Sequence, residues 1–312
     1  MRMSSVTTST PGSSRSSSTA APLAVARHAY LATHLMRTRN GADDDGGAWF
    51  ALDGGHRELA GVLRVGSGVL GGGPRPLARL QRTPGAGGLW HVWPELDPDS
   101  VEGGLVAAGF AFVEEEPVMM AALARPAAPG PDGPTAPGAD GPAVPGQGRA
   151  AVPGQGRAAG PGSGQPAEAW EIIAAETGPE LERWSRVWDP SIAADRRAQV
   201  AAGLFEVLEL APGRSHYALG LLVGRPVACA AVFTAEGVSA VEHVVTDSGH
   251  RGRGFGTLMT EHCLAVAREH GASQALLTAS AQGTGIYRRL GFRTVGMVRR
   301  YLAPSALRRA LL

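Results

Sequence analysis

A run of glycine and arginine near the middle of the C-terminal half is the segment best suited to bind a phosphorylated ligand. The residues that follow an apolar, strand-like segment are, in order, Arg251, Gly252, Arg253, Gly254, Phe255, Gly256 and Thr257. Glycine lets backbone N–H groups approach a ligand closely, and the planar guanidinium of arginine matches phosphate oxygens. A helix predicted to begin at Gly254 adds unpaired N–H donors and a positive partial charge. The pattern therefore predicts a pyrophosphate-binding loop.

The spacing of these glycines excludes two common nucleotide-binding loops. A dinucleotide fold needs Gly-x-Gly-x-x-Gly and an acidic residue at the end of the following strand. Here the pattern is Gly252-x-Gly254-x-Gly256, and the next predicted strand, at 275–279, does not lead to an acidic residue. A P-loop needs lysine, and all 29 basic residues of this chain are arginine.

A second motif, at 280–292, places a tyrosine on a short predicted helix. A phenol can donate a proton to a leaving group and so act as a general acid. The motif contains, in order, Ser280, Gly283, Tyr287, Gly291 and Phe292.

Together the two motifs resemble the GNAT superfamily of acetyl-CoA-dependent N-acetyltransferases. Arg251-x-x-Gly254-x-Gly256 is similar to the family signature Arg/Gln-x-x-Gly-x-Gly/Ala. The second motif is similar to Asn-x-x-Ala-x-x-x-Tyr-x-x-x-Gly-Phe, with Ser280 in place of asparagine and Gly283 in place of alanine. The resemblance covers residues 168–303.

The resemblance implies a fold, a co-substrate and a mechanism. The fold would be an α/β (α+β) GNAT fold: a mixed, mostly antiparallel sheet flanked by helices, preceded by a smaller α/β N-terminal domain. Acetyl-CoA would be the co-substrate, without a metal. Backbone groups of Val244 and Val245 would bind its pantetheine arm, residues 251–257 its pyrophosphate, and Ser280 and Tyr287 would also contact it. A primary amine would attack the thioester directly, with Tyr287 as the acid. The alternative is a non-catalytic module that senses acyl-CoA or binds a protein.

The base that deprotonates the incoming amine is less defined by the sequence. Glu242, on the strand before the loop, is either this base or a carboxylate facing solvent. His243 follows it, and strand alternation predicts that His243 points to the opposite face. Trp184 and Trp188 share a helix face, either as core residues or as a wall of the acceptor pocket.

The elements that position these residues can be predicted from apolar periodicity and from turn residues. In the C-terminal half we expect strands and helices in the order β-α-α-β-β-β-α-β-α-β. Their expected ranges are 170–174, 180–188, 194–208, 216–223, 227–236, 238–245, 254–270, 275–279, 284–290 and 292–302. In the N-terminal half we expect a strand at 89–93, a helix from 98 to 108, and strand segments at 110–113 and 118–123 separated by an exposed break at Glu114-Glu115-Glu116.

Composition divides the chain of 312 residues into five parts. Residues 1–22 and 305–312 are predicted tails, and 125–167 is a predicted linker rich in Pro, Gly and Ala, in which an octapeptide at 143–150 recurs at 151–158. The predicted domains are 23–124 and 168–304. The end of the first domain resembles the degenerate first half of two-part bacterial GNAT proteins, and it lacks the coenzyme signature.

Net charge and apolar content narrow the range of partners. A net charge of +1 gives no electrostatic reason to bind nucleic acid or an acidic membrane. No apolar run approaches the length of a membrane span, so we expect a cytoplasmic protein. The resemblance implies a bacterial protein with a small-molecule or peptide amine as acceptor, either monomeric or a homodimer. The two cysteines, Cys229 and Cys263, lie in apolar segments and are expected to be buried and reduced.

Overall fold

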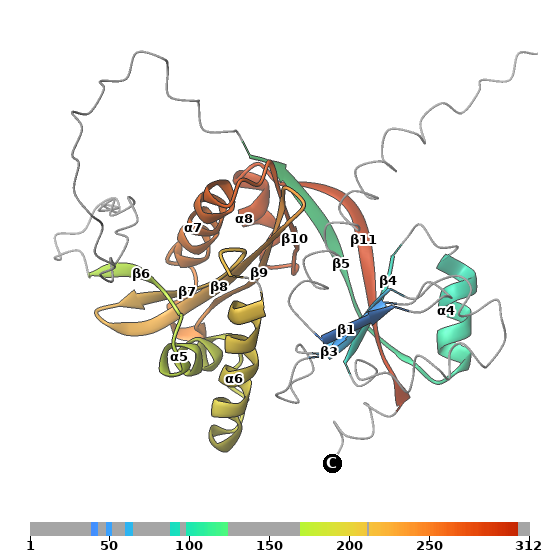
Figure 1. Cartoon of the computed structure of the whole chain (residues 1–312). Coiled ribbons are helices and arrows are strands. Elements are labelled where there is room, and N and C mark those ends of the chain that lie inside the picture. The colour runs from blue at the N-terminus through green and yellow to red at the C-terminus, as the bar shows by residue number, and fades with distance from the viewer. Residues whose placement is uncertain are drawn as a thin grey trace, which may run out of the picture.

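The computed structural model describes residues 39–42, 48–51, 60–64, 88–93, 98–123, 169–210 and 212–304. The described strands form one sheet in the order β1-β2-β3-β4-β11-β5-β10-β9-β8-β7-β6 (Figure 1). The tails predicted at 1–22 and 305–312 and the linker predicted at 125–167 lie outside the described residues.

The N-terminal half contributes five strands and one helix to the described structure. They are β1 (Arg39–Ala42), β2 (Ala48–Ala51), β3 (Ala60–Arg64), β4 (Leu89–Val92), α4 (Pro98–Ala107) and β5 (Ala111–Ala122). The C-terminal half follows in the order β6 (Trp170–Ala174), α5 (Gly178–Trp188), α6 (Ala194–Leu210), β7 (Ser215–Leu222), β8 (Arg225–Ala235), β9 (Val238–Thr246), α7 (Phe255–Glu269), β10 (Gln274–Thr278), α8 (Thr284–Arg289) and β11 (Arg293–Leu302). This is the element order that the sequence predicts for the C-terminal half.

Two local predictions need correction. Strand β5 runs without a break through the three glutamates, because arginines on β11 pair with their carboxylates. The predicted strand ranges 216–223 and 227–236 leave Gly224-Arg225-Pro226 as the turn between β7 and β8. It is formed by Val223 and Gly224, which both have positive φ, as the tightest hairpin turns require.

Local sequence explains the ends and buried faces of the main helices. Helix α5 begins with a capping box, in which Thr177 and Glu180 bind each other's backbone N–H groups. In α7 the apolar residues at helical spacing form one buried stripe, which comprises Phe255, Met259, Cys263 and Val266. The buried faces of α7 and α5 pack on opposite sides of the sheet.

Two cores lie on the two faces of the C-terminal sheet. Helices α7 and α8 cover one face, where Met259, Cys263 and Tyr287 pack with Val241 and Leu277. Helices α5 and α6 cover the other face, where Leu181, Trp184 and Leu204 pack with Tyr217 and Phe233. The mixed, mostly antiparallel sheet flanked by helices that the sequence predicts is confirmed, with β9–β10 and β3–β4 as its parallel pairs.

The two halves exchange strands. Strand β5 of the N-terminal half lies between β10 and β11, and β11 of the C-terminal half lies between β4 and β5. In the N-terminal half, β11 therefore lies between the two strands of the unit β4-α4-β5. In the C-terminal half, β5 lies between the two strands of the unit β10-α8-β11. The long β5 and β11 can be followed across the middle of Figure 1.

A third core crosses the predicted domain boundary. It joins Leu63, Trp93, Val118 and Met120 of the N-terminal half to residues of β9, β10 and β11, which are Val238, Ala240, Leu276, Val295 and Val298. The domain boundary that composition predicts near residue 124 stays a prediction. In space, the two halves share one sheet and one core.

Candidate active site

The glycine and arginine loop leads from the end of β9 to the first turn of α7. Gly254 is the N-cap of α7, with φ of 88°, a left-handed conformation that favours glycine. The helix has no side-chain cap, so its first N–H groups are available to a ligand at the positive end of the helix dipole. Arg251 and Arg253 are both exposed. The loop thus combines cations with backbone donors, as an anionic ligand requires.

Aromatic packing holds one side of this loop. The rings of Trp170, on β6, and Phe255 are stacked with centroids 4.5 Å apart, and the Arg253 guanidinium lies 5.3 Å from the Phe255 centroid. Trp170 lies so close to Gly220 that a Cβ there would come within 2.3 Å of its ring. The Arg251 side chain donates from Nε to the carbonyl of Thr246 at 3.2 Å.

The parallel pairing between β9 and β10 ends before the strand reaches the glycine and arginine loop. Its last partners are Ala240 and Leu276. Beyond them, in the described part of the chain, β9 pairs only with β8 on its other side. The first four residues of β9 are buried and the last five are half-buried. From Val241 to Thr246, β9 therefore presents a backbone edge to which an extended amide-containing ligand can add as a strand does.

A β-bulge interrupts β9 at this edge. Ala231 is opposite Glu242 and Cys229 is opposite Val245, so the bulge leaves both His243 and Val244 opposite one residue. Val244 packs into the core under α7, and Val245 packs into the core under α5.

The bulge corrects the prediction that His243 faces away from Glu242. His243 has φ of 55°, outside the strand conformation, and its Nε2 lies 3.6 Å from Oε2 of Glu242. The side chains of both residues are 14% exposed. Strand alternation fails here because the bulge adds one residue to β9.

Both tryptophans of α5 pack with the core under α5 and α6. Trp184 is fully buried and donates from Nε1 to the carbonyl of Ala230, so it is a core residue. Trp188 is half-buried, and its ring centroid lies 5.0 Å from that of His243. Trp188 therefore borders the half-buried pair of Glu242 and His243.

Tyr287 lies on the opposite face of the sheet, in the core under α7 and α8. Its side chain is nearly buried, and its ring packs edge-on against Phe292 at 5.9 Å between centroids. Burial raises the pKa of Tyr287 to about 12, with smaller contributions from Cys263 and Glu116. The phenol is therefore protonated at neutral pH, as a general acid must be.

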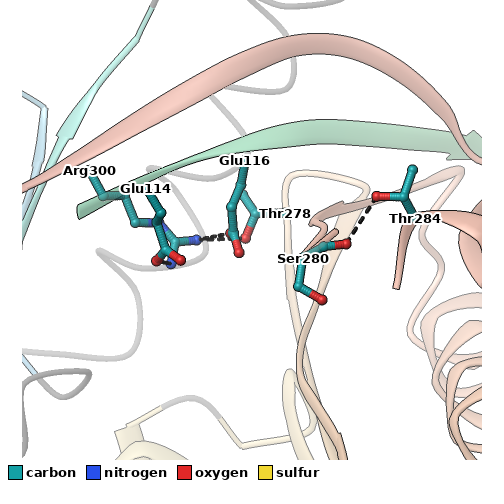
Figure 2. Close-up of polar contacts among 6 residues, drawn as sticks. All are labelled: Glu114, Glu116, Thr278, Ser280, Thr284 and Arg300. Carbon is teal, nitrogen blue, oxygen red and sulfur yellow. Dashed lines mark hydrogen bonds and ion pairs between the residues drawn. The ribbon is translucent and has the colours of Figure 1, made fainter. Parts of the chain in front are cut away.

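Both family departures in the second motif have local structural roles. A Cβ on Gly283 would come within 2.7 Å of Cε2 of Tyr287. The Ser280 Oγ accepts from the N–H of Gly283, and its carbonyl accepts from the Thr284 hydroxyl at 3.0 Å (Figure 2). Ser280 thus supports the start of the helix that carries Tyr287.

Residues that sequence analysis missed lie on β5, β10 and β11. Arg300 donates to Glu114 at 3.1 Å, to Glu116 at 2.5 Å and to the Thr278 hydroxyl at 3.0 Å. Figure 2 shows these four side chains together near the end of β10. No local signal in the sequence links them, because their contacts depend on the strand exchange.

Both cysteines are buried and free, as expected. Burial raises the pKa of the Cys263 thiol to about 12 and raises that of Cys229 as well. No helix among the described residues is long and apolar enough to cross a membrane. Within the same described ranges there is no group of three or more His, Cys, Asp and Glu side chains that could hold a metal ion.

One segment of the chain matches a known domain family, and the fold is similar to that of solved structures. Residues 213–294 match the family described as "Acetyltransferase (GNAT) domain". A GCN5-related N-acetyltransferase from Kribbella flavida superimposes with a TM-score of 0.57 and 21% identity, over 90% of this chain and 95% of its own. A functionally unknown conserved protein from Staphylococcus epidermidis superimposes with a TM-score of 0.50 and 9% identity, over 85% of this chain and 94% of its own. No curated protein sequence matches the chain.

The fold and the family match define the class. Residues 213–294 match the GNAT domain, and the fold of the chain is similar to that of the two solved structures over 90% and 85% of its length. GNAT domains in general use acetyl-CoA, and the match supports acyl transfer in general.

Proposed function

We propose that this protein is an N-acetyltransferase that moves an acetyl group from acetyl-CoA to a primary amine. The observation that carries the proposal is the coincidence of three features: the β9 edge beyond Ala240, the Arg251–Arg253 loop at the uncapped end of α7, and the protonated Tyr287. Each feature suits a different part of an acyl-CoA thioester.

The loop and strand suit the coenzyme. Backbone groups of Val244 and Val245 bind the amides of the pantetheine arm at the β9 edge. The arginines and the N–H groups at the start of α7 bind the pyrophosphate oxygens. Acetyl-CoA supplies the acetyl group that is transferred.

Two side chains of the protein, Glu242 and Tyr287, then each transfer a proton. The amine nitrogen forms a bond to the acetyl carbon while the carbon–sulfur bond breaks. Glu242, beside His243, accepts the proton that the ammonium loses before attack, directly or through water. Tyr287 gives its phenolic proton to the departing thiolate sulfur, the nitrogen of the new amide loses its second proton to water, and the phenol is reprotonated from solvent.

The first test is calorimetric titration with acetyl-CoA. The parent protein is expected to bind at one saturable site, and Arg251→Ala with Arg253→Ala is expected to weaken binding by about 100-fold or more, because each charge-assisted hydrogen bond contributes about 1.5–3 kcal/mol. Arg268→Ala, in the last turn of the same helix, is the control and is expected to bind normally. Absence of binding by the parent protein would refute the proposed function.

A further inference from the structure

One face of the sheet changes from apolar to charged at the end of the β9–β10 ladder. Ala240, Leu276 and Val118 lie on three neighbouring strands and share one core. Because side chains alternate along a strand, the residues two positions further on continue the same face. Those residues are Glu242 on β9, Thr278 on β10 and Glu116 on β5.

Cross-strand register supports this placement of Glu116. Val118 is opposite Thr278 on β10, and Glu116 is opposite Val298 of the shared core on β11. Glu114 is opposite Arg300, one pair further along. The N-terminal half therefore supplies carboxylates to the face that carries Glu242 in the C-terminal half.

Arg300 holds Glu116 in a fixed position. The side chains of Arg300 and Glu116 are only 12% and 13% exposed, whereas that of Glu114 is 42% exposed. Arg300 also binds the Thr278 hydroxyl at 3.0 Å, which ties the group to the end of β10 (Figure 2). Two carboxylates around one guanidinium leave a formal negative charge on this group, of which Arg300 and Glu116 are nearly buried, and a net negative charge attracts a cation.

Glu116 is also close enough to act on Tyr287. After burial and Cys263, the carboxylate of Glu116 is the third cause that raises the pKa of that phenol. Glu116 therefore has an electrostatic effect on the proposed acid, although the two residues are distant in the sequence.

We propose that Glu116 is an acceptor-binding residue, supplied to the active site by the N-terminal half, and that it selects amines carrying a second positive charge. Arg300 is the positioning residue that holds Glu116. The proposal rests on the proposed function, since it names the acceptor class of the same site. It also assigns the N-terminal half a role: without β5, the acceptor site is incomplete.

The test compares three probes of equal chain length: 1,4-diaminobutane, butylamine and 4-aminobutanoate. Calorimetric binding in the presence of CoA does not depend on turnover. We expect the parent protein to bind the diamine most tightly and the amino acid most weakly. Glu116→Gln is expected to weaken diamine binding by about tenfold or more, because it removes a charge-assisted contact, and to change acetyl-CoA binding less than about twofold.

Glu115→Gln is the matched control. Glu115 is the next residue of the same strand, faces the other side of the sheet and pairs with Arg299 at 2.9 Å. The Glu115→Gln variant is expected to leave diamine binding unchanged. Glu116→Asp, which keeps the charge, is expected to retain part of the diamine binding that Glu116→Gln loses. Thermal unfolding of each variant shows whether the fold is intact.

Kinetics separate this proposal from the proposed function. If acetyl transfer occurs, Glu116→Gln is expected to raise the KM for the diamine and to keep kcat within about threefold. Equal binding of all three probes, no amine binding by the parent protein, or equal losses in the Glu115 and Glu116 variants would each overturn the role of Glu116. Glu116-dependent diamine binding without any acetyl transfer would support this role and refute the proposed function.

Discussion

The ring of Tyr287 lies directly against the backbone of Gly283, so that a Cβ on Gly283 would come 2.7 Å from Cε2 of the ring. Contacts under 3.0 Å are not found for real Cβ atoms, so a larger residue at this position must displace the ring. The position of the proposed acid therefore depends on a glycine one helical turn before it.

The first prediction follows from this contact. Gly283→Ala is expected to shift the phenol and to lower kcat by about 10-fold to 100-fold, because small displacements of a reacting group have large effects on rate. Acetyl-CoA binding is expected to stay within about threefold of the parent, because Gly283 is not part of the pyrophosphate loop. Gly285→Ala is the control, since its Cβ would make an ordinary contact of 3.7 Å with Arg289. Equal kcat values for both variants would contradict the prediction.

The second prediction concerns the phenolic proton itself. Tyr287→Phe keeps the ring and removes the proton, so kcat is expected to fall by about 10²–10⁴-fold while calorimetric binding of acetyl-CoA is unchanged. Tyr301→Phe, at another buried tyrosine on β11, is the control and is expected to keep its activity. Full activity of Tyr287→Phe would mean that another group protonates the thiolate. Tight acetyl-CoA binding with no turnover by the parent protein would favour the acyl-CoA-sensing alternative.

The third prediction concerns a pair of histidines between β7 and α7. The Nε2 atoms of His216 and His262 lie 3.1 Å apart, so one ring donates a hydrogen bond and the other must be unprotonated to accept it. Burial lowers the pKa of His216 to about 4, with smaller contributions from His262 and His270. Burial also lowers the pKa values of His262 and His270, against a smaller opposite effect of Glu269.

A histidine whose pKa is lower in the folded protein than in the unfolded chain stabilises the fold above its unfolded pKa. This contribution is present above pH 6.5 and is lost as the pH falls from 6.5 through 4. For His216 the loss is at most about 3 kcal/mol. Urea unfolding measured from pH 8 to pH 4 should therefore show stability falling below pH 6.5, with a shallower fall in His216→Gln. An identical pH profile for the two proteins would contradict this assignment.

Local sequence was enough to predict the elements of the C-terminal half and the candidate coenzyme loop. The apolar stripe of α7 and the glycines around it are short-range signals, and the structure forms the helix and loop that they predict. The bulge at His243 was not predictable, because it depends on how β9 pairs with β8.

The charges of β5 show why the contacts of Arg300 with Glu114 and Glu116 could not be predicted. Three successive glutamates before a proline are typical of an exposed segment, and the sequence gives no local reason to read them otherwise. Their partners, Arg299 and Arg300, are more than 180 residues away, with a separation of 184 for the pair of Glu115 and Arg299. Only the strand exchange brings them together, and that pairing has no short-range pattern.

The strand exchange gives the fourth prediction, which concerns a fragment of residues 125–312. This fragment lacks β5, so β10 and β11 lose their shared neighbour, and Leu276, Val295 and Val298 lose their contacts with Val118 and Met120. Exposed strand edges beside an uncovered apolar surface favour aggregation. We therefore expect the fragment to be insoluble or to unfold without a cooperative transition in circular dichroism. Residues 23–124 supplied as a separate chain are expected to restore cooperative unfolding, because they return β5 to its place. A fragment that unfolds cooperatively by itself, with the stability of the full chain, would show that the exchanged strand is dispensable for the fold.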